Sequence, residues 1–149
     1  MPDRKRKNGD SVKEFLASAS EARLEAERLR NKLKRLEAIA TRTATAEQLA
    51  MLENMKAQST EALIRAEKQE ADVTEFLNLL PNAAYRAVLK LRYCEGLEWT
   101  GAPLQRTVQS EIAKVSPAYT YSERSIYRIH GEALRAAREL YKEKQDGKM

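Results

Sequence analysis

A heptad repeat over residues 11–40 constrains the fold of this chain more than any other feature of its sequence. The two core positions hold only small or apolar residues, namely Val12, Ala19, Ala26, Leu33 and Ala40 in one and Phe15, Ala22, Leu29 and Leu36 in the other. The positions between them are largely Glu, Arg, Lys and Ser, as the solvated face of a coiled coil requires. A capping box, Ser11 to Glu14, precedes the repeat. The pattern predicts a long helix over residues 11–40 that packs along an alanine-rich seam.

A second long helix is expected from Ala46 to about Leu79, because Thr45 and Gln48 form another capping box after the interruption at residues 41–45. Its seam is weaker than the first and contains Leu52, Met55, Ser59, Ala62, Ala66, Gln69, Val73, Phe76 and Leu80. Two long helices with a short connection favour an antiparallel hairpin. The pattern leaves open whether this hairpin is a stalk without a specific partner or a dimerising coiled coil.

The C-terminal half is punctuated by Pro81 and Gly96, which favour a helix from about Asn82 to Cys94. Its expected buried stripe is Val88, Leu89, Leu91 and Tyr93. A loop is expected from Trp99 to Thr107, followed by a helix from Val108 to Val115 with Ile112 and Ala113 inward. A turn is expected at Ser116 and Pro117. The last helix is expected to be capped by Ser122 and to run to about Lys144. The sequence thus predicts an all-α chain.

The composition leaves little equipment for catalysis. Cys94 is the single cysteine and His130 the single histidine, so the chain has neither an internal disulfide nor a histidine pair. P-loop, nucleophile-elbow and metal-binding motifs are absent from the sequence. We therefore expect no enzyme, no catalytic residue, no cofactor and no metal. Mean hydropathy is −0.66, and no apolar run approaches the ~18 residues that span a bilayer. Without a signal peptide either, we expect a cytoplasmic protein with no membrane partner.

The last expected helix separates into an apolar and a basic side. Its apolar stripe consists of Ile126, Ile129, Ala133, Ala137 and Leu140, and its basic residues are Arg124, Arg128, Arg135, Arg138 and Lys142. A short helix, a turn and a longer helix with an exposed basic front are typical of a helix-turn-helix, whose second helix enters the DNA major groove. Arginine suits base recognition because its guanidinium can donate two hydrogen bonds to guanine O6 and N7.

Residues 80–139 also resemble the C-terminal promoter-recognition domain, region 4, of sigma-70 factors. The leucine-proline start and V-L-x-L-R-Y core of that family correspond to Leu80, Pro81, Val88, Leu89, Leu91, Arg92 and Tyr93. Its E-I-A motif corresponds to Glu111, Ile112 and Ala113, and its later run corresponds to Ser122, Ile126, Ile129, Ala133, Leu134 and Arg138. The Y-R-I-H-G-x-A-L variant after a helical pair is similar to small phage- and prophage-encoded regulators of the ArpU/RinA type. Two departures are an insertion from Thr100 to Ser110 and a longer turn between Ala113 and Ser122.

The resemblance implies that Glu123, Arg124, Tyr127 and Arg128 face base pairs. Candidate phosphate contacts are Arg106, Lys114, Ser122, His130, Arg135 and Arg138. His130 is expected to bond phosphate or another part of the chain rather than a metal, and Trp99 is expected to anchor its loop. Tyr119 and Tyr121 are expected to pack the turn.

We accordingly expect a disordered basic tail at 1–10, a helical hairpin at 11–80 and a sigma region-4-like helix-turn-helix domain at 81–149. The expected function is sequence-specific DNA-binding regulation of phage or prophage transcription in the bacterial host cytoplasm. The expected partners are double-stranded DNA, RNA polymerase, and a second copy of the chain bound through the N-terminal helices. The alternatives are a small terminase-like DNA-packaging subunit and a structural coiled-coil adaptor.

Overall fold

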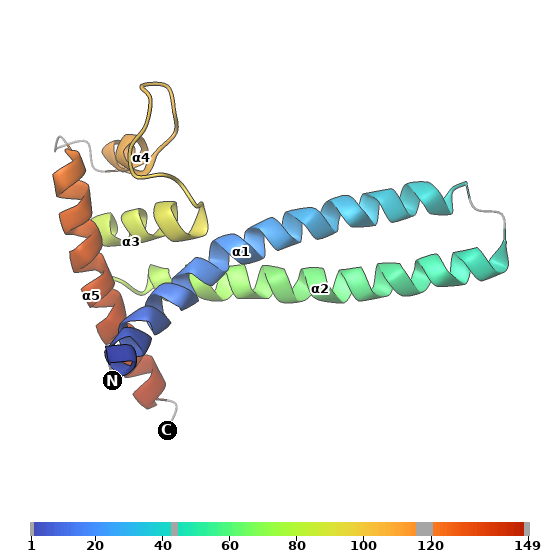
Figure 1. Cartoon of the computed structure of the whole chain (residues 1–149), viewed down its shortest axis with the longest axis horizontal. Coiled ribbons are helices and arrows are strands. Elements are labelled where there is room, and N and C mark those ends of the chain that lie inside the picture. Colours follow the sequence, from blue (N-terminus) through green and yellow to red (C-terminus); the bar gives the residue numbers. More distant parts are fainter. Residues whose placement is uncertain (1, 43–44, 116–120, 148–149) are drawn as a thin grey trace.

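The computed structural model describes residues 2–42, 45–115 and 121–147, with side chains described from Ser11 onward. Within these ranges the chain is all-α and has no strand. The helices are α1 (Pro2–Ala40), α2 (Ala46–Asn78), α3 (Ala83–Leu89), the π-helical turn η1 (Lys90–Cys94), α4 (Val108–Val115) and α5 (Glu123–Gly147). The antiparallel α1 and α2 project as a long arm from one end of the molecule, where α3, α4 and α5 gather (Figure 1).

Helix α1 begins ahead of the position that the sequence predicts. Its first residue is Pro2 rather than a residue after Ser11, so residues 2–10 are helical where a disordered tail is expected. Proline suits a first helical turn, and no second proline interrupts the run to Ala40. The start of α2 is as predicted, because the Thr45 side chain accepts a hydrogen bond of 3.2 Å from the backbone N–H of Gln48.

The α1–α2 seam follows most of the predicted heptad positions. The wholly or nearly buried ones are Val12, Ala19, Ala22, Ala26, Leu29 and Leu36 in α1, and Leu52, Ser59, Ala66, Val73 and Phe76 in α2. Gln69 is half-buried and donates from Nε2 to the Ser18 hydroxyl at 2.8 Å, which satisfies two polar groups within the seam. The prediction for Met55 is wrong, since its side chain is 40% exposed.

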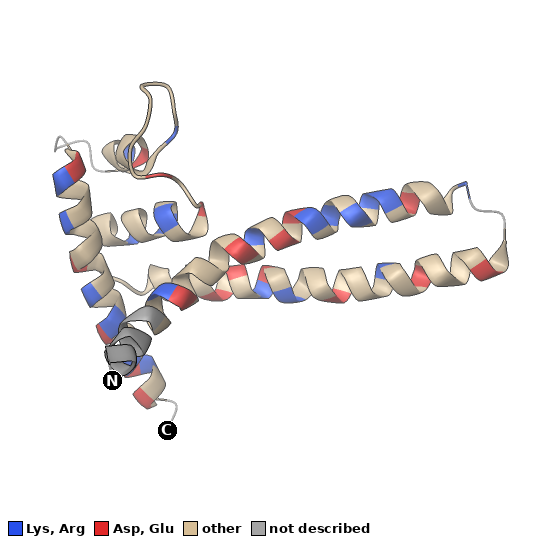
Figure 2. Cartoon of the chain, viewed as in Figure 1, with Lys and Arg blue, Asp and Glu red and all other residues tan. Residues whose placement is uncertain are grey.

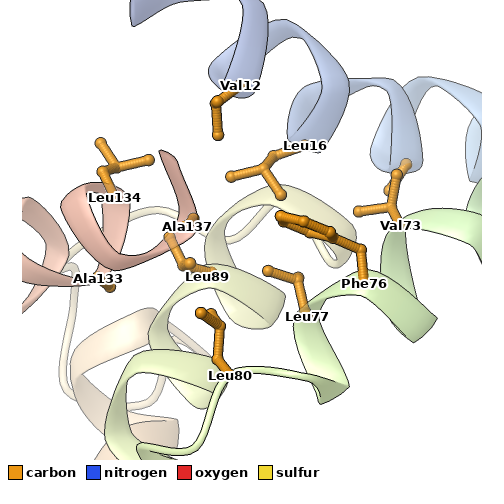
Figure 3. Close-up of a cluster of buried hydrophobic side chains, with 11 residues drawn as sticks. Val12, Leu16, Val73, Phe76, Leu77, Leu80, Leu89, Ala133, Leu134 and Ala137 are labelled. Atoms are coloured by element: carbon orange, nitrogen blue, oxygen red, sulfur yellow. The ribbon is translucent and has the colours of Figure 1, made fainter. Parts of the chain in front are cut away.

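Two fully buried leucines, Leu16 and Leu77, lie outside the predicted seam. They belong to a hydrophobic core that the hairpin base shares with α3 and α5 (Figure 3). The buried members of this core are Val12, Leu16, Ala19, Val73, Phe76, Leu77, Leu80, Leu89, Ala133, Leu134 and Ala137. The core therefore crosses the expected boundary between residues 80 and 81, and it fixes α5 against the base of the arm.

A second core joins α3, η1, α4 and the first half of α5. Its buried residues are Val88, Leu91, Val108, Ile112, Tyr121, Ile126 and Ile129. Tyr121 packs the turn as predicted, whereas Ser116, Pro117 and Tyr119 lie outside the described residues. The inward prediction for Ala113 is wrong because this side chain is exposed. In the last turn of α4 the buried residue is its neighbour Ile112.

The ends of α3 and η1 follow from local chemistry. The Asn82 side chain caps α3 by accepting a hydrogen bond of 3.1 Å from the Tyr85 N–H. Gly96 has φ of +68°, a left-handed conformation that glycine adopts without strain, and it ends the segment as predicted. None of the described helices has the length and apolar character needed to traverse a lipid bilayer.

Candidate nucleic-acid interface

Helix α5 begins at a side-chain cap, as the sequence predicts. The Ser125 N–H donates to the Ser122 hydroxyl at 3.1 Å, and the two hydroxyl groups lie 2.9 Å apart. The helix then continues to Gly147, slightly beyond the expected end at Lys144. The backbone carbonyl of Tyr121 accepts a 2.6 Å hydrogen bond from Gln109 Nε2, which ties α4 to the residue just before the cap. These bonds set where the first turn of α5 lies relative to α4.

One face of α5 is buried and the opposite face carries a row of cations. The buried residues are Ile126, Ile129, Ala133, Leu134 and Ala137. The opposite face presents residues 124, 128, 131, 135, 138 and 142, whose spacing alternates between four and three. Five of these six positions are Arg or Lys and the other is Gly131. At ~1.5 Å per residue the row is about 27 Å long, and Figure 2 shows Lys and Arg along the length of α5.

These cations, which we call the α5 basic row (Arg124, Arg128, Arg135, Arg138 and Lys142), point to solvent. All five are exposed, and among the described residues none of them forms an ion pair within the chain. The base of the arm packs on α5, and the rest of α1 and α2 extends away from it (Figure 1). The row is therefore a positive strip on an exposed helix face, broken at Gly131, and such a strip attracts a polyanion.

Glu123 and Tyr127 lie beside the row in the first turns of α5. The Tyr127 hydroxyl donates to Glu123 Oε1 at 3.1 Å, and this bond raises the pKa of the phenol. The Tyr127 and Trp99 rings pack in a T-shaped arrangement with centroids 5.5 Å apart, yet 46% of Tyr127 stays exposed. The residues expected to face bases, Glu123, Arg124, Tyr127 and Arg128, are thus all exposed in one region.

An aromatic cluster behind α5 anchors the Trp99 loop, as the sequence predicts. The Arg92 guanidinium lies 4.7 Å from the centre of the Trp99 ring, and the His130 ring meets Trp99 with centroids 4.6 Å apart. His130 Nε2 and the Tyr93 hydroxyl are hydrogen-bonded at 2.9 Å. Burial, followed by the positive charges of Lys13, Arg92 and Arg138, lowers the pKa of His130 to about 4. His130 is therefore a neutral packing residue at physiological pH.

Arg106 and Lys114 belong to a separate ion-pair cluster. Arg106 lies 2.6 Å from Glu95 and 2.7 Å from Glu111, and Lys114 lies 2.6 Å from Glu111. The hydrogen bonds from Lys114 and then Arg106 lower the pKa of Glu111. This cluster fastens the loop before α4 to the end of η1, so both expected phosphate contacts already neutralise carboxylates of the chain.

The structure thus groups some of the expected site residues and separates others. Arg135 and Arg138 continue the row begun by Arg124 and Arg128, and Ser122 caps the same helix. Lys142, which was not among the expected contacts, extends the row by one more turn. The alternating spacing of four and three residues was the signal that could have found it. Comparison with protein-family models, with curated proteins and with solved structures finds no match to this chain.

Proposed function

We propose that the chain is a sequence-specific double-stranded DNA-binding protein that regulates phage or prophage transcription. The observation that carries the proposal is the α5 basic row, because five cations share one exposed face directly opposite the buried face. Helix α4, tied to the start of α5 through Gln109, supports the interpretation of the pair as a helix-turn-helix. The resemblance of residues 80–139 to sigma region 4 supports promoter DNA as the target.

In this proposal the N-terminal turns of α5 enter the major groove. Arg124 and Arg128 donate to guanine O6 and N7, and each bidentate contact contributes about 1–3 kcal/mol of discrimination. Glu123 accepts from a cytosine amino group, and Tyr127 lies beside it with an exposed edge. Arg135, Arg138 and Lys142 contact phosphates, which position the helix without reading sequence.

The hairpin has a distinct role in this proposal. Its arm carries six exposed large apolar side chains, namely Leu24, Ile39, Leu49, Met51, Met55 and Ile64. We propose that the arm dimerises the protein or docks on RNA polymerase. A symmetric dimer would place two α5 helices on half-sites about 34 Å apart, or a multiple of that distance.

The proposal is tested by selecting duplexes from a random-sequence pool with the purified chain. We expect one enriched motif, and loss of both affinity and motif in the variant Arg124→Ala plus Arg128→Ala. The matched control is Arg35→Ala plus Arg65→Ala, which removes the same charge from exposed arginines of the arm and should leave the motif unchanged.

Two other outcomes would contradict the proposed regulatory function. A ring-shaped assembly that binds duplexes without a preferred motif would indicate a DNA-packaging subunit. Binding to no duplex at all would indicate a structural coiled-coil adaptor.

A further inference from the structure

Gly131 interrupts the α5 basic row at its centre. It lies three residues after Arg128 and four before Arg135, one turn beyond Tyr127 on the exposed face. Glycine in the interior of a helix is destabilising relative to alanine, because it loses more backbone freedom on folding. The glycine must therefore be explained either by a contact within the chain or by a contact with another molecule.

The structure supplies no internal reason for this glycine. Among the described residues the one positive φ belongs to Gly96, so the backbone of Gly131 is one that any residue adopts. A Cβ built on Gly131 would meet no atom within 4 Å, so no neighbouring helix needs the space. Alanine would fit the folded chain and strengthen the helix. The fold therefore leaves open space over Gly131, where another molecule can approach the main chain of α5.

We propose that a DNA strand crosses α5 at Gly131, with its sugar-phosphate backbone in van der Waals contact with the helix main chain. This inference rests on the proposed function and specifies how deeply α5 enters the groove. The expected base contacts Glu123, Arg124, Tyr127 and Arg128 precede Gly131. The expected phosphate contacts Arg135 and Arg138 follow it. A strand crossing between these two groups separates base reading from phosphate binding. A methyl group at residue 131 would lift the helix away from both.

The test compares wild type with Gly131→Ala and Gly131→Leu on a duplex of about three helical turns selected by the wild-type protein, and on a scrambled duplex. We expect Gly131→Ala to raise Tm by about 2–4 °C and to weaken binding to both duplexes about tenfold. A tenfold loss corresponds to ~1.4 kcal/mol. Gly131→Leu should weaken binding further. The control Asn54→Ala, at an exposed position of α2, should also raise Tm but leave binding unchanged.

Gly131→Ala is expected to raise Tm but to weaken DNA binding, so the two measurements together distinguish the possible results. Gly131→Ala binding as tightly as wild type would overturn the strand crossing while leaving the proposed function intact. A loss restricted to the selected duplex would also overturn it, because bases rather than a backbone would then lie over Gly131. A fall in Tm would show that the glycine is required inside the fold. Failure of the wild-type protein to enrich any duplex from the random-sequence pool would refute the proposed function itself.

Discussion

Leu16 in α1 provides a direct test of the core that joins the hairpin to α5. Its side chain is fully buried, and it lies between Val12, Leu134 and Phe76 in Figure 3. The heptad alone would treat the hairpin and the C-terminal helices as separate units. The structure instead predicts that a cavity made in α1 destabilises the C-terminal helices as well.

The magnitude follows from the burial of the side chain. Truncating a buried leucine to alanine removes its transfer free energy and leaves a cavity, which together cost about 2–5 kcal/mol. For a chain of this size each 1 kcal/mol lowers Tm by about 2–4 °C. We therefore expect Leu16→Ala to lower Tm by about 6–12 °C, taking ~3 kcal/mol as the central value.

Two probes measured during one thermal melt decide the question. Far-ultraviolet circular dichroism reports all helices, whereas fluorescence of Trp99, the single tryptophan, reports the packing of its loop on α5. We expect Leu16→Ala to shift both transitions equally. Leu24→Ala lies on the same helix, but its side chain is 58% exposed. It should change the free energy of unfolding by no more than about 0.5 kcal/mol, so both transitions should stay close to the wild-type temperature. A fluorescence transition that stays at the wild-type temperature in Leu16→Ala would refute the shared core.

Three further predictions concern α5. Between pH 6.5 and 4 the unfolded chain binds a proton at His130 that the folded chain does not, so stability should fall as pH drops through this window. Because the His130 ring is half-buried, we expect the free energy of unfolding to fall by about 1–2 kcal/mol. Tm measured at the two pH values should show this difference, and His130→Phe should abolish it. A pH profile of Tm that is unchanged in His130→Phe would contradict the assignment to His130. Arg138→Ala should weaken binding to every duplex and reduce the salt slope by about one, whereas a change in preferred motif would place Arg138 on a base. Ser122→Ala should lower the free energy of unfolding by about 1 kcal/mol, measured by thermal unfolding, whereas Ser122→Asp should keep the helix cap and the stability. Equal losses of stability in both variants would exclude a capping role for Ser122.

Several features of the fold could be predicted from the sequence because they depend on neighbours along the chain. Thr45, Asn82 and Ser122 cap helices through bonds that span three residues, and Gly96 ends η1 through its own backbone freedom. The bounds of α4 follow equally local signals. The basic side of α5 is likewise visible in the sequence, since residues three or four apart share a helix face.

The tertiary structure decided what these faces meet. Leu16 and Leu77 escape the heptad because they belong to the core that the hairpin base shares with α3 and α5, whose members are far apart in sequence. Distance along the chain likewise hides the Tyr93 hydroxyl that bonds His130, 37 residues away. The ion pairs of Arg106 and Lys114 join residues closer in sequence, but those of Arg106 depend on the path of the loop before α4.

Periodicity and capping signals thus predicted most of the helical residues and which of them share a helix face, although not residues 2–10 of α1. Only the folded structure determined which of the charged side chains pair with carboxylates and which remain exposed on α5, because the path of the loop before α4 sets the partners of Arg106 and the packing of α5 sets which of its faces meets solvent.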